Sequence, residues 1–341
     1  MKKRLLKPPQ NDAELFVSPS ISTLLTFLGA DKTICTAHQP YFFNPGVSVK
    51  FLFLNALAPN NKKILFLDTD RVHISVLVPH EAGSSYPIEF IRSEKILCDC
   101  PAPSKETCET FFSSLKSTIK KNIPSYASGI NKNIGLFQEL LLSKKYTYLK
   151  EMLAESFLSF YGMQKEYGFV SSLVRSKEFE DFFARIWSDD TAYRDVFNNA
   201  LDEYRKEYRF RYKNFPFPKL EDGELPFWVI KSQQRYRCFK KDISNTDVRN
   251  IGVFPRASTL TIFLRLYACD IFLHGIGGAN YEWVGDRVVE RFFKKDPPLW
   301  GVVSGTFLVG MFKERELPYF FFDPQMIKDK IEEVIKGGIY A

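Results

Sequence analysis

Two segments far apart in the chain each place a histidine and glycines directly after an apolar run. Residues 36–46 read TAHQPYFFNPG and contain His38, and residues 272–287 read FLHGIGGANYEWVGDR and contain His274. Imidazoles exchange protons or contact phosphates, and glycine-rich turns expose backbone N–H groups. Because α/β proteins build ligand sites from loops at strand ends, we predict that the two segments form two halves of one pocket.

Polar groups next to His38 would complete the first half of this pocket. Gln39 offers an amide, while Asn44 and Gly46 open a predicted helix whose N-terminus favours an anion. Lys50 lies inside that helix, where its ammonium could neutralise a phosphate or a carboxylate. The same residue types fit equally well a polar strand–turn–helix junction with a solvated lysine.

The second segment combines backbone donors with polar side chains after His274. Its glycines would give N–H groups to a ligand, and its side chains would orient a substrate from the following helix. The candidate binding residues are Gly275, Gly277, Gly278, Asn280, Tyr281 and Asp286. The spacing is not that of a dinucleotide fingerprint or a P-loop, and the alternative is a tight turn whose glycines serve geometry alone.

A third group of polar residues follows the apolar run ILFL. Asp68 and Asp70, with His73 downstream, offer ligands suited to a divalent metal. The Asp-x-Asp pattern is similar to that of sugar-nucleotide glycosyltransferases, where it holds manganese under the diphosphate. The alternative is that Asp70 caps the next turn and pairs with Arg71. With His38 and His274, Asp70 completes the set of candidate catalytic residues.

Basic residues supply two further candidates. Arg256 precedes a predicted helix and could clamp a carboxylate or phosphate, or else form a surface ion pair. The stretches 204–213 and 235–241 interleave arginine with aromatic residues, a pattern that binds nucleic acid or simply covers a solvated helix end.

The composition predicts a folded chain with a large core. Apolar residues make up 45% of the 341 residues, enough for one large α/β core or for two domains. The net charge of +7 is compatible with a nucleotide, a nucleic acid or an acidic metabolite as ligand, and it demands none of them. No pair of cysteines has zinc-binding Cys-x-x-Cys spacing, so we expect reduced thiols.

Apolar runs and helical spacing alternate as expected of an α/β fold with a parallel sheet. Strands or extended segments are predicted at 33–37, 62–70, 74–79, 86–100, 300–309 and, as a hairpin, at 227–230 and 235–239. Helices are predicted at 21–29, 44–57, 104–122, 134–145, 147–161, 176–187, 190–208 and 323–336, with a helix or strand-and-helix run at 257–273 and a helix capped by Asn280.

These elements predict a Rossmann-like parallel sheet core with a largely helical insertion. The expected parts are an N-terminal tail with a short helix at 1–30, a first part of the core at 31–100, the insertion at 101–225 and a second part of the core at 226–341. The basic start does not fit a signal peptide, and the apolar stretch 258–274 contains Arg265 and Asp270. We therefore expect a cytoplasmic protein without a membrane span.

The motifs resemble those of the bacillithiol synthase family, the putative cysteine-adding enzymes. The family's Gln-Pro-like segment with a following Gly and Lys is matched by His38, Gln39, Pro40, Gly46 and Lys50. Its acidic strand end with a histidine is similar to ILFLDTDRVH, through Asp68, Asp70 and His73. Its Arg-Pro-like segment, apolar helix and Gly-Gly motif are similar to FPRASTLTIFLRL and HGIGGANY, through Arg256, Gly277 and Gly278.

The resemblance implies a Rossmann-like core, a nucleotide-binding pocket and ligation of cysteine to an amino-sugar conjugate. Two departures limit it. The family's Gly-Gly is followed by Pro and Glu, whereas Ala279, Asn280 and Tyr281 follow here. The family also dimerises through a long C-terminal coiled coil, and no sustained heptads occur near the end of this chain.

The sequence therefore predicts an enzyme of the ligase or group-transfer type that binds a nucleotide, such as ATP or ADP, or a phosphorylated metabolite. A small molecule with an amine or thiol would be its substrate. The first alternative is a metal-dependent nucleotide-sugar glycosyltransferase that uses Asp68 and Asp70. The second is a non-enzymatic protein that binds RNA or a partner through 204–213.

Overall fold

The computed structural model describes residues 14–18, 32–57, 61–80, 85–209, 215–243, 252–307 and 317–339. The helix predicted at 21–29 lies outside these ranges, as does most of the predicted N-terminal tail. Within the described ranges, no helix combines the length and the apolar character needed to cross a membrane.

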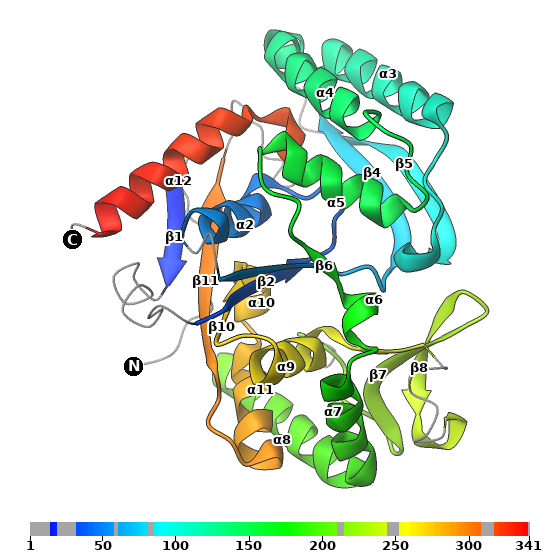
Figure 1. Cartoon of the computed structure of the whole chain (residues 1–341), viewed down its shortest axis with the longest axis vertical. Helices are drawn as coiled ribbons and strands as arrows, with labels where there is room; N and C mark the ends of the chain where they lie inside the picture. The colour runs from blue at the N-terminus through cyan, green and yellow to red at the C-terminus, as the bar shows by residue number, and fades with distance from the viewer. Residues whose placement is uncertain are drawn as a thin grey trace.

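A six-stranded sheet forms the centre of the molecule (Figure 1). Its strands, in spatial order, are β1 (Glu14–Ser18), β11 (Leu299–Thr306), β10 (Ile271–His274), β2 (Ile34–His38), β3 (Lys62–Phe66) and β6 (Gly168–Phe169). Only β1, which pairs with β11, runs antiparallel to its neighbour in this sheet. The predicted α/β class with a mostly parallel sheet is confirmed.

Two hydrophobic cores lie on opposite faces of this sheet, because successive residues of a strand point to opposite sides. In β2, Ile34 belongs to the first core and Cys35 to the second. In β10, Leu273 belongs to the first core and Phe272 to the second. Strands that are buried on both faces read as continuous apolar runs, which is why these segments were recognisable in the sequence.

Helices cover both faces of the sheet (Figure 1). The first core contains residues of α2 (Pro45–Leu57), α3 (Lys105–Asn122), α4 (Ala127–Leu141), α5 (Leu149–Phe160) and α12 (Pro324–Ile339). The second core contains residues of α6 (Val170–Leu173), α7 (Lys177–Ser188), α8 (Asp190–Tyr208), α9 (Ala257–Tyr267) and α11 (Glu282–Val288). The short helix α10 (Ile276–Ala279) connects β10 to α11, and a π-helical turn (Val289–Phe293) follows.

The predicted helical insertion is divided between the two cores. Its helices α3, α4 and α5 belong to the first core, and α6, α7 and α8 belong to the second. The chain passes from one face to the other at β6, where Phe169 packs against the first core and Val170 lies in the second. Since β6 also pairs with β3, this stretch completes the central sheet.

Two smaller antiparallel sheets flank the central one. The segments predicted at 74–79 and 86–100 form β4 (Arg71–Pro79) and β5 (Ser85–Ile96), which pair with each other outside the central sheet. The predicted hairpin is confirmed as β7 (Glu224–Lys231) and β8 (Gln234–Phe239), joined by β9 (Val253–Pro255). Short 3-10 turns lie at Leu97–Asp99, Pro124–Tyr126, Lys240–Asp242 and Tyr319–Phe321.

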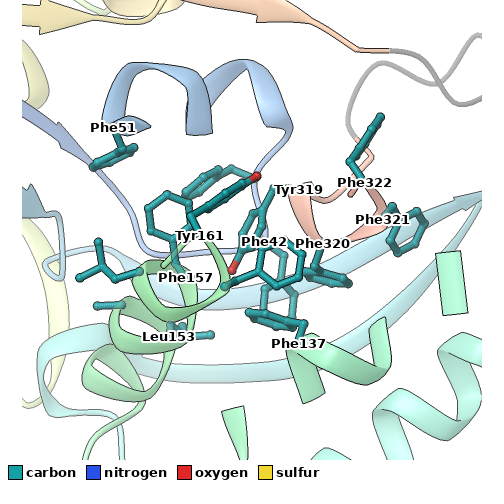
Figure 2. Packing of buried hydrophobic residues seen from close by; sticks show 14 of the residues in the cluster. Phe42, Phe51, Phe137, Leu153, Phe157, Tyr161, Tyr319, Phe320, Phe321 and Phe322 are labelled. Atoms are coloured by element: carbon teal, nitrogen blue, oxygen red, sulfur yellow. The ribbon is translucent and has the colours of Figure 1, made fainter. Parts of the chain in front are cut away.

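Aromatic rings fill the first core and fix the loop that follows β2. Figure 2 shows Phe42 from this loop among the rings of Phe137 and Phe320, which stack with centroids 4.6 Å apart. The next residue, Phe43, packs on Phe157 and accepts a backbone hydrogen bond from Tyr319 at 2.8 Å. The loop between His38 and α2 is therefore anchored by burial of its two phenylalanines.

Candidate functional site

The two histidine segments lie at the ends of the neighbouring strands β2 and β10. Between these two strands, the direction in which the chain adds strands to the sheet reverses. From β2 the chain continues through α2 to β3 on one side, and from β10 it continues through α11 to β11 on the other. In open α/β sheets, ligands bind outside the carboxyl ends of the strands at such a switch point. His38 is the last residue of β2, and His274 is the last residue of β10.

The register between β2 and β10 sets the distance between the two histidines. Leu273 lies opposite Thr36, whose hydroxyl donates to the Leu273 carbonyl at 2.9 Å. His274 is therefore level with Ala37, one residue before His38. With strands ~4.8 Å apart and a rise of ~3.3 Å per residue, the two backbones are about 6 Å apart.

The side chains of the two histidines nevertheless leave the sheet on opposite faces. The His38 ring packs edge-on against Phe43 of the first core, with centroids 5.2 Å apart. The His274 ring lies 4.5 Å from that of Phe272, which belongs to the second core. The structure thus brings the two segments to one sheet edge, and a ligand there would be approached by one imidazole from each face.

Lys50 is a buried cation at this edge. It lies in α2, which packs between the sheet and α12, and only 3% of its surface is exposed. Its Nζ donates to the Ala37 carbonyl at 2.7 Å, and no carboxylate lies within ion-pair distance in the part of the chain that the structure describes. Burial lowers the pKa of Lys50 to about 7. A lysine in this state lacks the counter-ion that a buried charge normally has.

His38 is neutral at physiological pH. Burial and the nearby charge of Lys50 lower the pKa of His38 to about 3. Its Nδ1 lies 3.0 Å from the Gln39 carbonyl oxygen, which can only accept, so Nδ1 carries the proton. Nε2 is then left with a lone pair, and His38 can contribute a hydrogen-bond acceptor rather than a positive charge.

His274 belongs to a buried charge network that we call the Arg265 network: Arg265, Glu282, Asp286 and His274. Arg265 donates to both Glu282 and Asp286, the latter at 2.6 Å, and to the Pro298 carbonyl. Glu282 Oε1 lies 3.2 Å from His274 Nε2, although neither atom makes an aligned hydrogen bond. Arg265, Glu282 and His274 are each less than 5% exposed.

The protonation states within the Arg265 network follow from burial and charge. Burial acts to raise the pKa of Glu282, but His274 and Arg265 outweigh it and hold that pKa at about 2. Burial lowers the pKa of His274, against the opposing effect of Glu282. Burial also raises the pKa of Asp286, against the pull of Arg265. At neutral pH the network therefore contains an ionised Glu282 beside a neutral imidazole.

The glycines after His274 have different surroundings. A Cβ added at Gly278 would lie 2.7 Å from His274 Nδ1, whereas one at Gly275 or Gly277 would meet nothing within 4 Å. Gly278 is thus required by the position of the imidazole. Gly46, at the start of α2, is required in the same way, because its Cβ would lie 2.5 Å from the Gly305 carbonyl oxygen.

Alanine substitutions should separate the two kinds of glycine. We expect Gly278→Ala to cost about 1–3 kcal/mol of folding free energy, because the methyl group displaces the His274 ring. Gly277→Ala, one residue away and exposed, should be neutral or stabilise by up to about 1 kcal/mol. Denaturant unfolding of both variants measures the difference, and equal effects would contradict the assigned role of Gly278.

Asn280 and Tyr281 take positions that differ from the prediction. Asn280 is the C-cap that follows α10, and Tyr281 rather than Asn280 precedes the first residue of α11, because the expected helix is broken into two. Tyr204 donates its hydroxyl hydrogen to the Asn280 carbonyl at 2.5 Å. The Tyr281 ring packs edge-on against Phe217, and burial raises the pKa of Tyr281 to about 12.

The expected metal ligands do not come together. Asp68 is fully buried and is bound by Lys150 at 2.9 Å and by both the backbone N–H and the hydroxyl of Ser171. Asp70 pairs with Arg235, and His73 is exposed beside Glu89. Among the described residues, no group of three or more His, Cys, Asp or Glu side chains is placed to hold a metal.

There is a physical reason why Asp68 is not available as a metal ligand. A buried carboxylate needs cations and hydrogen-bond donors, and Asp68 finds them in α5 and α6, which approach the end of β3 only after the chain has folded. Asp70 remains at the sheet edge, where it also accepts a hydrogen bond from the Gln39 amide at 2.7 Å. The Arg235–Asp70–Gln39 contacts join the β7–β8 hairpin to the loop after β2.

The arginines at and near this hairpin are paired with carboxylates. Arg256 pairs with Glu224, and its guanidinium lies 4.4 Å from the Trp228 ring centre. Cations of the 235–241 stretch are also paired, as Arg235–Asp70, Arg237–Glu221, Arg237–Glu224 and Lys240–Asp190. Residues 210–213 of the other basic stretch lie outside the described ranges.

Sequence reasoning missed Arg265 and Glu282. A charged residue inside the apolar run of 257–267 was a usable signal, because such a residue must find a partner once the helix is buried. Glu282 and Asp286 stand four residues apart, so one helix face carries both carboxylates. The sequence does not reveal that this face meets Arg265.

Comparison of the chain with protein-family models, with curated proteins and with solved structures finds no match in any of the three.

Proposed function

We propose that this protein is an enzyme of the ligase or group-transfer type that binds a nucleotide or a phosphorylated metabolite at the sheet edge between β2 and β10. The sheet has the switch point that Rossmann-like cores use for this purpose. The resemblance to the cysteine-adding enzymes points to the same chemistry, with a small amine or thiol as the second substrate.

The burial of Lys50 without a counter-ion carries this proposal. An isolated ammonium in the protein interior is costly, and proteins keep such groups where they act. A phosphate or carboxylate bound beside Lys50 would supply the missing negative charge. His38 Nε2 offers a hydrogen-bond acceptor to the same ligand.

The two alternative functions gain less support. A metal-dependent glycosyltransferase needs Asp68 and Asp70 as ligands, and both carboxylates are bound by cations of the protein. The RNA-binding alternative rests on 204–213, where Arg205 donates to the Phe215 and Phe217 carbonyls and residues 210–213 lie outside the described ranges. The arginines of the second basic stretch, 235–241, are paired with carboxylates. Neither alternative accounts for Lys50.

Ligand binding should take up a proton at Lys50. Its pKa of about 7 rises when a phosphate is bound beside it, because the negative charge favours the ammonium. At about pH 8, where the phosphates of ADP and ATP are already ionised, we expect uptake of close to about one proton per ligand. Calorimetric titrations in two buffers of different ionisation enthalpy measure this number.

A matched variant and a ligand panel complete the test. Lys50→Arg keeps the charge but cannot lose its proton, so it should bind without uptake. A thermal-shift screen of ATP, ADP, nucleotide sugars and inorganic phosphate identifies the ligand, since a specific ligand stabilises the fold. Absence of stabilisation by every phosphate compound, or binding by the wild-type protein without proton uptake, would overturn the proposal.

A further inference from the structure

We infer that His274 is a general base that accepts a proton at Nδ1 from an amine or thiol nucleophile, and that Glu282 and Arg265 are its positioning residues. This inference rests on the proposed function, because it assigns the class of second substrate at the same site. Glu282 and Arg265 were not among the residues expected from the sequence.

The contact between Glu282 and His274 selects the tautomer of the ring. Glu282 Oε1 is 3.2 Å from His274 Nε2, and although the two atoms are not aligned as a hydrogen bond, the negative charge of the carboxylate attracts a proton to the nearer ring nitrogen. A proton on Nε2 is therefore favoured, and the lone pair is left on Nδ1. A carboxylate that orients a histidine in this way, and later balances the charge of the imidazolium, is a recurring arrangement in acyl-transfer enzymes.

Arg265 fixes the carboxylate that orients the ring. It binds Glu282, Asp286 and the Pro298 carbonyl at once, so it is held by three partners. The positive charge of Arg265 helps to keep Glu282 ionised, as the lowered pKa of that carboxyl reflects. Glu282 could not stay charged in the interior without this cation.

The Gly278 backbone packs against the Nδ1 side of the His274 ring, of which 4% is exposed, and adds no side chain there. Any residue with a Cβ at this position would place it 2.7 Å from Nδ1 and would block the lone pair. On either side, the Cβ positions of Gly275 and Gly277 face open space. Of the two ring nitrogens, only Nε2 is both fully buried and without an aligned partner. The basic nitrogen therefore lies on the side of the ring next to the glycine turn.

The proton transfer is balanced by these groups alone. The N–H or S–H bond of the nucleophile breaks, a bond forms between the proton and Nδ1, and the electron pair stays on the nitrogen or sulfur. Burial is the largest effect against the resulting imidazolium and Lys50 and Arg265 add to it, whereas Glu282 favours it. A phosphate bound beside Lys50 would cancel part of that opposition. His274 should therefore become a stronger base once the anionic ligand is bound.

Nitrogen NMR of protein labelled with ¹⁵N-histidine tests the inference without any knowledge of the reaction. The chain has four histidines, which can be assigned by replacing each with glutamine in turn. We expect His274 to be neutral at neutral pH, with its proton on Nε2. His38 is an internal contrast, because its contact with the Gln39 carbonyl predicts the opposite tautomer, with the proton on Nδ1.

Two glutamate variants separate the role of Glu282 from a general effect of charge. Glu282→Gln should remove the preference for the Nε2 proton, since an amide can donate as well as accept. Glu290→Gln makes the same change close by, where the carboxylate is exposed and pairs with Arg287, and should leave the spectrum of His274 unchanged. If Glu282→Gln does not fold, the protonation state and tautomer of His274 in the wild-type spectrum still test the inference.

A His274 that carries its proton on Nδ1, or that is charged at neutral pH in the free protein, would overturn the inference. Addition of inorganic phosphate to the wild-type protein should raise the titration midpoint of His274, and an unchanged midpoint under saturating phosphate would overturn the coupling to Lys50. Because the tautomer is read in the ligand-free protein, it can fail while phosphate binding succeeds, and the reverse also holds.

Discussion

Replacement of Lys50 by methionine is expected to stabilise the free protein and to abolish its binding of phosphate-bearing ligands. The substitution removes a buried ammonium that has no carboxylate partner and puts an apolar side chain of similar length in its place. Exchange of buried charge for apolar volume stabilises proteins by about 1–4 kcal/mol. Opposite effects on stability and binding are the expected mark of a residue kept for function.

The pH dependence of this gain has a defined direction. The folded pKa of Lys50, about 7, lies below its value in an unfolded chain, near ~10.4. Between these values the unfolded chain binds more protons, so wild-type stability should rise with pH over this window. The advantage of Lys50→Met should then be largest below about pH 7 and should shrink as the pH rises towards ~10.4.

Denaturant unfolding at several pH values, with a phosphate-binding titration, measures both parts of this prediction. Lys63→Met is a matched control, because Lys63 also donates to a backbone carbonyl, at 2.8 Å, but is exposed. Its stability change should stay within about 0.5 kcal/mol. A Lys50→Met protein that is less stable than wild type, or that still binds phosphate compounds, would refute the role given to Lys50.

Replacement of Arg265 by methionine should have the opposite effect and destabilise the fold by about 3–5 kcal/mol. Arg265 is fully buried between two carboxylates, so its removal leaves the buried Glu282 and the partly exposed Asp286 without their cation. The comparison with Lys50 is informative because both are buried cations. Lys50 has no carboxylate partner, so its removal should stabilise the fold, whereas Arg265 is required by the two carboxylates that it binds.

A double variant identifies the cause of the Arg265 effect. Arg265→Met with Glu282→Gln removes one of the stranded charges and should recover part of the lost stability. Arg185→Met, at an exposed pair with Asp189, should change stability by less than about 1 kcal/mol. Equal losses in the single and double variants would show that packing, not charge, is responsible.

Acid unfolding should report the same network. The pKa of Glu282 is lowered to about 2 in the folded protein, against ~4.3 for a glutamate in an unfolded chain. A lowered carboxyl pKa adds stability that is complete above the unfolded value and is lost as the pH falls towards the folded value. The wild-type protein should therefore lose this contribution between about pH 4.3 and about pH 2.

Elements with a strong local signal could be predicted from the sequence. The strand before His38, the capped helix that begins at Pro45 and the hairpin around 232 follow from apolar or aromatic runs and an Asn–Pro start. The meeting of the two histidine segments was also expected, from the tendency of α/β sheets to collect loops at one edge. The face to which each histidine points depends on register and was not expected.

The fate of charged residues could not be predicted, because it depends on partners far away in the chain. Asp68 is bound by Lys150, which lies 82 residues later, and Asp70 pairs with Arg235, which lies 165 residues later. From the local sequence alone, two aspartates after a strand favour a metal site. Only the tertiary structure shows that Asp68 and Asp70 are bound by a lysine and an arginine.

The passage of the chain through β6 determines how far this protein could be shortened. A true insertion could be cut out and its ends joined, leaving the parent domain intact. Removal of 101–225 would instead uncover Phe66 on one side of β3 and Leu65 on the other, since the excised helices belong to both cores. Lys150 would go as well, leaving Asp68 without its cation. The middle of the chain thus contributes side chains to both hydrophobic cores, and neither core is complete without it.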